Sequence, residues 1–546
     1  MPRIVFTSTL TRGIPLVLAL LASCTGDGDF WVVTGGGLPE DETTGAPGTT
    51  GELPGTTGAP ETTSTTGYDP MAHFDVAPPL PSSDAPVPGT CLDALKNPSS
   101  MGCLFYALDL DRLDNEDEAT FAIAVANVHD EGETAAVVEV RKGTQWYEME
   151  TIGPLGPGEV ELLTLPDRHY DSSGWSLAGA YRVIAERPVT VYQWNGLDPA
   201  PQSGGDVSLL TPASSFTSSY EALGRNTTDA LVRATYVAII ASVNGTEVTI
   251  YPTAETLPGN LVTSGGPDQP IKVTLDEGDV AQIATAPSAM EVQHGLAGTR
   301  VESGGEHPIA VLTGHACAAV PSDETVCDYM EEQVSPHLYG EQFLAPRLPL
   351  RDLENPEHTL WQIYALVDNT TVTVDGETSE GGPQNDSLLL QAGEIAELWI
   401  TGPGQHVGDV EIQADHLISV TGYITNATDL PGGTNLGGPG MVQLAPVDRY
   451  LSRYVIYAPP GWDRVVAVIT RPTGAETTID DALIDDAASP IGDGFEVLHV
   501  PLEGDALYTL RGDDSFGVVL IGYGPNSGFA TIGGWGTPLE EGLPPR

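Results

Sequence analysis

Hydrophobic and polar residues alternate in short runs along most of the chain, which is the pattern of β-strands with one buried face. Two of these runs are nearly the same, VNGTEVTIYPT at 243–253 and VDNTTVTVDGE at 367–377. In the middle of each, Asn244-Gly245 or Asp368-Asn369 tolerates the positive φ of a tight hairpin turn. The pattern therefore predicts a β-hairpin at both places, and its recurrence indicates a repeated fold.

A second motif follows the hairpins and extends the repeat over most of the chain. The sequence Leu-x-x-Gly-acid-Val/Ile occurs at 155–160, 275–280 and 390–395. Further on, a strand pair places a glycine at corresponding positions, spaced by 118, 108 and 100 residues: Gly196, Gly314, Gly422 and Gly522. The first and last copies, VANVHDEGETAAVVEV and ITRPTGAETTID, have altered turns but keep the order of elements. Four copies are therefore expected.

The second copy contains seven short runs separated by turn residues, namely SYEAL, TYVAIIAS, TEVTIYP, IKVTL, DVAQIAT, TRVES and IAVLTG. Seven short strands at this spacing favour a β-sandwich. No amphipathic helix of 12 or more residues is predicted. We therefore expect an all-β protein with four tandem repeats of about 100-120 residues, each β-sandwich-like. The alternative is a closed, propeller-like arrangement of four units around an axis.

The N-terminus has the features of an export signal. Arg3 and Arg12 precede an apolar run at 14–22, which is too short to span a membrane as a mature helix. The run leads into Leu-Ala-Ser-Cys at 21–24, which resembles the lipobox of bacterial lipoproteins, in which the cysteine receives lipid and becomes the new N-terminus. We expect residues 1–23 to be a lipoprotein signal peptide and Cys24 to carry the anchor, with an ordinary signal peptide as the alternative.

Residues 24–88 differ in composition from the rest of the chain. Gly, Thr, Pro and acidic residues dominate, and no Lys or Arg occurs between Arg12 and Lys96. Such a segment cannot bury enough apolar surface to offset its chain entropy, so we expect a disordered tether. About sixty flexible residues have a root-mean-square span of roughly 45 Å, which would hold the repeats away from the membrane. A low-complexity insertion without a spacing role is the alternative.

The remaining chain exceeds the length that one hydrophobic core serves, so several domains are expected. The repeat divides this part of the chain into four: 89–206, 207–330, 331–436 and 437–546.

Several stretches in these repeats resemble the IgGFc-binding protein N-terminal domain family. The most specific is GHACAAVPSDETVCDYMEEQVSPHLYGEQFLAP, and LAPVDRYLSRYVIYAPPGW follows in the fourth repeat. The fourth repeat departs from the family at Ile479-Asp480-Asp481, where Leu-Asp-Gly is usual. The family occurs in animal mucus proteins and bacterial surface lipoproteins. The resemblance implies an extracellular module for binding or adhesion to a protein, glycan or matrix ligand, without showing that this chain binds antibody.

Four cysteines besides Cys24 remain in the exported chain. An even number favours disulfides, and the close pairs Cys91 with Cys103 and Cys317 with Cys327 are the simplest of three connectivities. A metal site and free thiols are the alternatives. His315 lies near Cys317, but no Cys-x2-Cys or His-x3-His spacing occurs.

Acidic residues crowd the segment 109–118, where Asp109, Asp111 and Asp114 are candidate calcium ligands. The spacing does not match an EF-hand loop, so a solvated acidic loop is the stronger interpretation, and no metal is expected. No nucleophile elbow, zinc-protease motif or phosphate-binding loop occurs, so neither an enzyme nor a cofactor is expected.

The net charge of −55 argues against nucleic acid as a partner and against direct docking on anionic lipid. The features together predict a lipid-anchored cell-envelope protein of the outer membrane, exposed at the surface, that binds an extracellular protein or glycan. The alternatives are an envelope hydrolase with an unrecognised site and a purely structural envelope protein.

Overall fold

The structure is a computed structural model of the chain. It describes residues 31–33, 87–113, 119–169, 172–197, 204–226, 234–286, 295–321, 327–376, 386–427, 430 and 435–537. The expected signal peptide, Cys24 and nearly all of the expected tether lie outside the described residues. Strands make up 55% of the structure and helices 4%, which confirms the all-β prediction. Among the described helices, none combines the length and the apolar character needed to cross a membrane.

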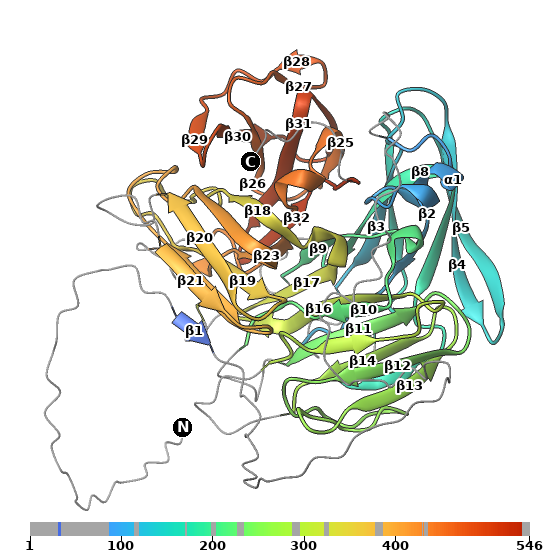
Figure 1. Ribbon diagram of the computed structural model, residues 1–546. Coiled ribbons are helices and arrows are strands. Elements are labelled where there is room, and N and C mark those ends of the chain that lie inside the picture. Colours follow the sequence, from blue (N-terminus) through green and yellow to red (C-terminus); the bar gives the residue numbers. More distant parts are fainter. Residues whose placement is uncertain are drawn as a thin grey trace, which may run out of the picture.

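Four units of strands follow one another along the chain and surround a common centre (Figure 1). The first unit contains α1 (Cys91–Lys96), β2 (Gly102–Ala107), β3 (Phe121–Ala126), β4 (Thr134–Lys142), β5 (Gln145–Leu155), β6 (Val160–Leu165), β7 (Gly174–Ser176), β8 (Tyr181–Asn195) and β9 (Asp206–Leu209). The second contains β10 (Ser219–Glu221), β11 (Thr235–Ala241), β12 (Thr246–Tyr251), β13 (Ile271–Leu275), β14 (Val280–Ala284), β15 (Arg300–Glu302), β16 (Ile309–Ala318) and β17 (Asp328–Val334).

The third unit contains β18 (Gly340–Ala345), β19 (Thr359–Ala365), β20 (Thr370–Gly376), β21 (Asp386–Leu390), β22 (Ile395–Ile400), β23 (Val410–Tyr423) and β24 (Met441–Gln443). The fourth contains β25 (Leu451–Ala458), β26 (Arg464–Pro472), β27 (Thr477–Ile479), β28 (Ala482–Leu483), β29 (Ser489–Ile491), β30 (Phe495–Leu502), β31 (Ala506–Gly524) and β32 (Ser527–Ile532). A separate strand, β1 (Trp31–Val33), lies beside the third unit (Figure 1).

One long strand connects the two halves of a unit. In the third unit, β23 pairs through its first half with β18 and β20 and through its second half with β19 and β24. β8 and β31 have the same position in the first and fourth units, whereas the second unit divides this strand into β15 and β16 and forms two sheets. The described sheet ladders are antiparallel, and some of the sheets are curled into half-barrels, none of them closed. The exact domain boundaries expected from the sequence stay predictions.

The two repeated motifs recur together because, within a unit, the hairpin turn is hydrogen-bonded to the turn of the Leu-x-x-Gly-acid motif. In the third unit, Asp368 Oδ1 of the hairpin turn accepts a hydrogen bond from the Ala392 N–H (3.0 Å), and Asn244 accepts from the Glu277 N–H (3.0 Å) in the second. The acid of the second motif closes its own turn, since Glu394 Oε2 accepts from the backbone N–H three residues before it (2.8 Å). The preceding glycine has φ +82°, which explains why the motif requires glycine.

The matched glycines of the later strands are needed because aromatic rings lie over them. A Cβ atom on Gly422 would lie 2.5 Å from the ring of Trp361, and one on Gly522 would overlap the ring of Phe529. Both positions pair with the strand of the same unit that precedes the hairpin turn. The spacing of these two glycines in the sequence therefore marks the same packing position in the third and fourth units.

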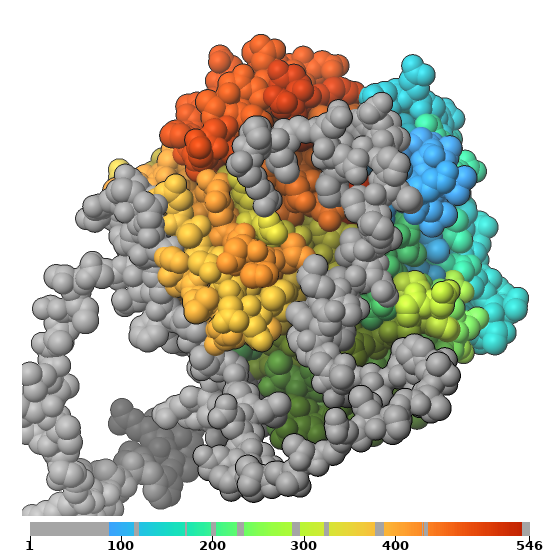
Figure 2. Space-filling view, in the orientation of Figure 1, coloured from blue at the N-terminus to red at the C-terminus, as the bar shows by residue number. Residues whose placement is uncertain are grey.

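The innermost strands of the four units are β9, β17, β24 and β32, and they pack around a central axis. β9 contacts β17 and β32, and β24 contacts the same two strands, so the four strands close a ring. Figure 2 shows neighbouring units in close contact with one another, coloured in chain order from blue to red. The closed arrangement, which was the alternative from the sequence, thus describes how the sandwich-like units assemble.

Short 3₁₀ helices connect each inner strand to the next unit, namely η2 (Ala213–Ser215), η3 (Pro336–Leu338) and η5 (Val447–Arg449). Where a fourth connection would lie, the C-terminal segment returns to the first unit. The Ser100 N–H donates to the Trp535 carbonyl (3.0 Å), and Thr537 Oγ1 donates to the Pro98 carbonyl (2.8 Å). These contacts, 435 residues apart in the case of Ser100 and Trp535, fasten the last unit to the first.

Candidate functional site

A single buried carboxylate joins all four units at the axis. Asp206 is fully buried and begins β9. Its Oδ1 accepts hydrogen bonds from the backbone N–H groups of Val207 (2.9 Å) and Ala530 (3.3 Å). Its Oδ2 accepts from the N–H groups of Met441 (3.1 Å) and Glu331 (3.3 Å). One donor comes from each unit, so this side chain fixes the relative positions of the four inner strands.

Other buried acids lie on the neighbouring inner strand β17. Glu331 Oε2 accepts a hydrogen bond from the Tyr329 hydroxyl (2.6 Å), and its Oε1 accepts from Gln193 Nε2 (3.2 Å). Burial raises the pKa of Glu331 to about 8. Burial also raises the pKa of Glu332, which accepts from the Ser208 hydroxyl (3.1 Å). The centre of the ring is therefore a polar core linked by hydrogen bonds, in which Glu332 Oε2 has no partner among the described residues.

An open cavity lies away from the axis, at the seam between the third and fourth units. It is a cavity of about 570 Å³ that is open to solvent. The third unit contributes the loop 350–354 and residues 405–406, and the fourth contributes Arg464, Asp486, Ala487 and His499. We call this the seam cavity. Its position between two units and its mixed lining make it the candidate binding site.

The wall of the seam cavity is fixed from both units. Arg347 is fully buried, and its guanidinium donates to carbonyl oxygens only, among them those of Gly402 (2.8 Å) and Val407 (2.8 Å). Burial lowers the pKa of Arg347. From the fourth unit, Arg464 Nη1 donates to the Leu350 carbonyl (2.6 Å). His499 Nε2 lies 3.2 Å from the Arg347 carbonyl. The loop that borders the cavity is thus held in one position.

The electrostatics of the seam cavity favour recognition through hydrogen bonds. Burial, together with the charges of His406 and Arg464, lowers the pKa of His499 to about 4, so this imidazole is neutral at pH 7. Its Nε2 donates to the Arg347 carbonyl, and its Nδ1 is buried without a hydrogen-bond partner among the described residues. Leu353, 64% exposed, adds an apolar contact at the rim. Gln405, Arg464 and Asp486 in the lining offer donors and acceptors to a bound chain, beside this one apolar anchor.

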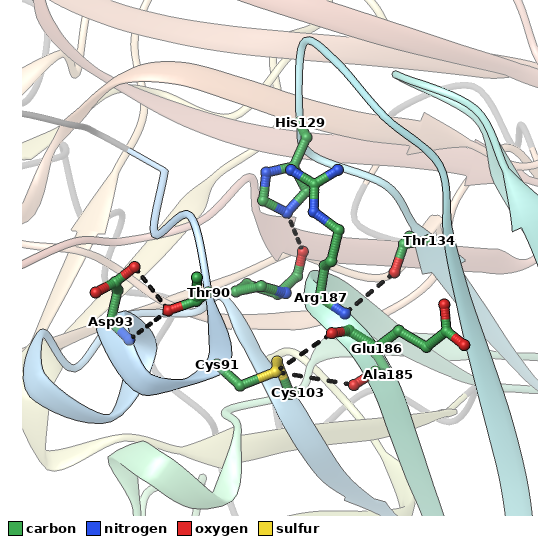
Figure 3. The surroundings of a disulfide bond; sticks show 10 residues. Thr90, Cys91, Asp93, Cys103, His129, Thr134, Ala185, Glu186 and Arg187 are labelled. Carbon is green, nitrogen blue, oxygen red and sulfur yellow. Dashed lines mark hydrogen bonds between the residues drawn. A yellow bond between two sulfur atoms is a disulfide. The ribbon is translucent and has the colours of Figure 1, made fainter.

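Both disulfides that the sequence predicted are present. Cys91 in α1 is bonded to Cys103 in β2, with Cα atoms 5.6 Å apart. Figure 3 shows this bond beside β8, where Cys91 Sγ lies 3.9 and 3.7 Å from the carbonyl oxygens of Ala185 and Glu186. A disulfide sulfur carries no hydrogen, so these are packing contacts. The bond fastens α1 to β2, which pairs with the long strand β8.

The second disulfide joins Cys317 to Cys327, with Cα atoms 5.2 Å apart. It connects the end of β16 to the residue before β17, so it restrains an inner strand of the ring. The segment that the family resemblance singled out therefore contributes directly to the axis.

Two of the three calcium candidates are placed by the structure, and they do not lie on a solvated loop. Asp109 and Asp111 are buried, 6% and 8% exposed. Asp109 Oδ2 accepts from the Arg168 N–H (2.9 Å), and Asp111 Oδ2 accepts from the Ser172 N–H (2.8 Å). Asp114 lies outside the described residues. The solvated-loop interpretation is therefore wrong for the first two, because their carboxylates are used to position the segment that leads to β7.

A different set of side chains meets at Asp109. Its carboxylate and the side chains of Asp167 and His169 have potential ligand atoms within 4.8 Å of one another. Burial raises the pKa of Asp109 to about 7, and the nearby Asp167 adds to the shift. His169 Nδ1 lies 2.5 Å from Asp167 Oδ1, so the imidazole already pairs with this carboxylate. The sequence did not bring these three residues together.

The sequence also missed Asp206, Arg347 and His499. Asp206 is one of 76 acidic residues, and nothing in GGDVSLL distinguishes it. A usable signal did exist for the seam. An arginine in the apolar stretch LAPRLPL must find several acceptors when it is buried, which predicts a closely packed loop at Arg347.

Comparison with known proteins gives one result. The model of the family described as IgGFc binding protein matches residues 206–522, which is more than half of the chain. No curated protein and no solved structure matches. The matched residues begin at the axial carboxylate and include the second and third units, the disulfide at Cys317 and the seam cavity. This protein belongs to the IgGFc binding protein family, a family of binding domains.

Proposed function

We propose that this protein is a lipid-anchored receptor of the bacterial outer membrane that binds an extracellular protein at the seam cavity. The family match over residues 206–522 carries the proposal, because the family is one of protein-binding domains. The seam cavity supports it, since fixed donors and acceptors beside an exposed leucine suit a loop of a folded partner. The lipobox at 21–24 supports the anchor.

The anchor is tested by replacing Cys24 with Ala. We expect the wild-type protein to sediment with membranes at high salt and the Cys24→Ala protein to appear in the soluble fraction. Each buried methylene of an acyl chain contributes roughly 0.8 kcal/mol, so losing the acyl chains removes most of the membrane affinity. Sedimentation of the Cys24→Ala protein with membranes at high salt would show that the anchor lies elsewhere.

Binding is tested with the soluble Cys24→Ala chain on a panel of immobilised probes. The panel contains immunoglobulin Fc fragment, mucin and fibronectin, each with and without enzymatic removal of its glycans, and a set of free oligosaccharides. We expect at least one deglycosylated protein to be bound. Binding confined to free oligosaccharides and glycosylated probes would contradict a protein ligand and favour a glycan ligand.

The position of the site is tested with two matched substitutions. Leu353 at the rim of the seam cavity and Leu389 on β21 are exposed to nearly the same extent, 64% and 61%. Leu353→Arg places a long charged side chain at the cavity, and we expect it to weaken binding by about tenfold or more. Leu389→Arg should leave binding unchanged. Equal binding by the two variants would place the partner outside the seam cavity.

A further inference from the structure

One edge of the sandwich is covered by an added strand in three of the four units. This edge belongs to the strand that follows the Leu-x-x-Gly-acid turn or its counterpart. In the second unit β14 pairs with β7, in the third β22 pairs with β1, and in the fourth β30 pairs with β29. Each added strand has three residues and runs antiparallel to the edge. Only the last comes from within its own unit; β7 comes from the first unit and β1 from the N-terminal segment.

The corresponding strand of the first unit, β6, pairs with β3 alone among the described strands. Its burial differs accordingly. All five residues of β14 are buried, whereas only Leu165 of the six residues of β6 is buried. β6 nevertheless has the sequence VELLTL, with four apolar residues. An apolar edge strand of this kind is normally protected, so an edge that no second described strand covers calls for an explanation.

The hydrogen-bonding pattern identifies the groups that face outward. Bonded pairs alternate along an antiparallel ladder. The Asn127 N–H donates to the Glu159 carbonyl (2.9 Å), so the bonded pairs along β3 and β6 include Glu161 and Leu163. The backbone N–H and C=O groups of Leu162 and Thr164 must then point away from β3. They form a row of the kind that a further strand would pair with.

The three strands that cover the other edges indicate what such a strand contains. Trp175 at the middle of β7 packs against the core of the second unit. Ile491 at the end of β29 is 1% exposed and belongs to the largest core cluster. β1 has the sequence Trp-Val-Val. In β7 and β29 a short extended segment adds backbone hydrogen bonds and supplies a bulky apolar residue.

We propose that the outer edge of β6 is a strand-addition site that captures an extended segment of the bound protein. The segment pairs antiparallel with Leu162 and Thr164 and carries a bulky apolar side chain flanked by small or polar residues. Backbone hydrogen bonds provide affinity, and the place of the apolar residue provides specificity. This inference rests on the proposed function, since it assigns a second contact to the same partner protein.

The experiment uses the full Cys24→Ala chain and a labelled peptide of residues 171–179, DSSGWSLAG, which contains the strand that covers β14. We expect the peptide to bind and to slow hydrogen exchange of the segment 158–166. Leu162→Pro removes one outward N–H and leaves the β3 ladder intact, so peptide affinity should fall about tenfold, as for the loss of one hydrogen bond. Leu162→Val keeps the N–H and should bind like the parent. A peptide that carries Trp175→Pro should bind more weakly than the original peptide to the parent, Leu162→Pro and Leu162→Val chains.

Several outcomes would overturn the inference. Equal peptide binding to the Leu162→Pro and Leu162→Val chains would place strand addition at another edge. Exchange protection of other segments in the absence of protection at 158–166 would do the same, and this measurement needs no substitution. If a panel protein binds the parent chain and the Leu162→Pro chain equally well while the peptide does not bind, the strand site is absent and the proposed function stands. Peptide capture without binding of any panel protein would support the edge and contradict the proposed function.

Discussion

The axial carboxylate predicts a large effect from a very small chemical change. Asp206→Asn keeps the size and shape of the side chain and replaces one oxygen with an NH₂ group. Both carboxylate oxygens now accept hydrogen bonds, two each, from the N–H groups of the four units. An amide has only one acceptor oxygen, so in either orientation its NH₂ group faces two backbone N–H donors.

The magnitude follows from the two donors that lose their acceptor. A buried N–H left without a partner costs about 1–3 kcal/mol, so two of them lower the free energy of unfolding by roughly 2–6 kcal/mol. The lower value applies if the ring opens slightly to admit water. Burial raises the pKa of Asp206, and the N–H groups of Val207 and Met441 oppose that shift. A side chain that accepts four hydrogen bonds is favoured as the carboxylate.

The measurement is denaturant unfolding at neutral pH, followed by tryptophan fluorescence. Asp268→Asn is the control, because it removes the same charge from an exposed loop of the second unit. We expect the control to lie within about 0.5 kcal/mol of the parent. If Asp206→Asn also lies within that range, the carboxyl group is already protonated in the folded protein, and its hydrogen bonds do not hold the units together.

Three further predictions concern other parts of the ring. The pKa of Glu331 is about 8 in the folded protein and about 4.3 in an unfolded chain, so its neutral form stabilises the fold at low pH and this stability is lost as the pH rises toward 8. In the parent protein, this group alone lowers the free energy of unfolding by about 1.4 kcal/mol for each pH unit between roughly pH 5 and 8. Glu331→Gln should abolish this contribution, so its free energy of unfolding should fall less steeply over the same range, as measured by denaturant titration at several pH values. Gly245 has φ +72°, and no atom outside its immediate chain neighbours lies within 4 Å of the place that a Cβ atom would take. Gly245→Val should therefore cost about 1–2 kcal/mol through backbone strain alone and lower the melting temperature by a few degrees, while partner binding persists. Lost binding with an unchanged melting temperature would make this turn part of the site. Peptide mapping without reduction should show Cys91 linked to Cys103, and a Cys91–Cys327 link would contradict the structure. Replacing both cysteines with Ser should lower the free energy of unfolding by roughly 2–3 kcal/mol.

Local features of the fold could be predicted because each depends on neighbouring residues. The hairpin at Asn244-Gly245 and the turn at Gly393 follow from residue types that accept positive φ, and both are present. The disulfides join cysteines 12 and 10 residues apart, so proximity in the sequence was a sufficient guide. The all-β class followed from the alternation of apolar and polar residues over many short runs.

The ring and the sites could not be predicted in the same way. The inner strands β9 and β24 have four and three residues and are buried throughout, so they show no alternation that would reveal a strand. The donors to Asp206 come from positions as far away as Ala530, and no local pattern links them. The seam cavity depends on Arg464 and His499 meeting a loop that precedes them by more than a hundred residues.

The closed ring also explains how surfaces on different units can serve one partner. The contact of Ser100 with Trp535 makes the first and fourth units neighbours, although they lie at opposite ends of the described chain. Apolar side chains of β6 and of the fourth unit, including Leu162 and Leu507, pack against the same cluster, and the fourth unit also borders the seam cavity. A partner held at the seam cavity would therefore lie against a unit that shares a hydrophobic cluster with one face of β6. Two weak contacts on one rigid frame bind more tightly than either alone, because the second contact forms without a further loss of translational freedom.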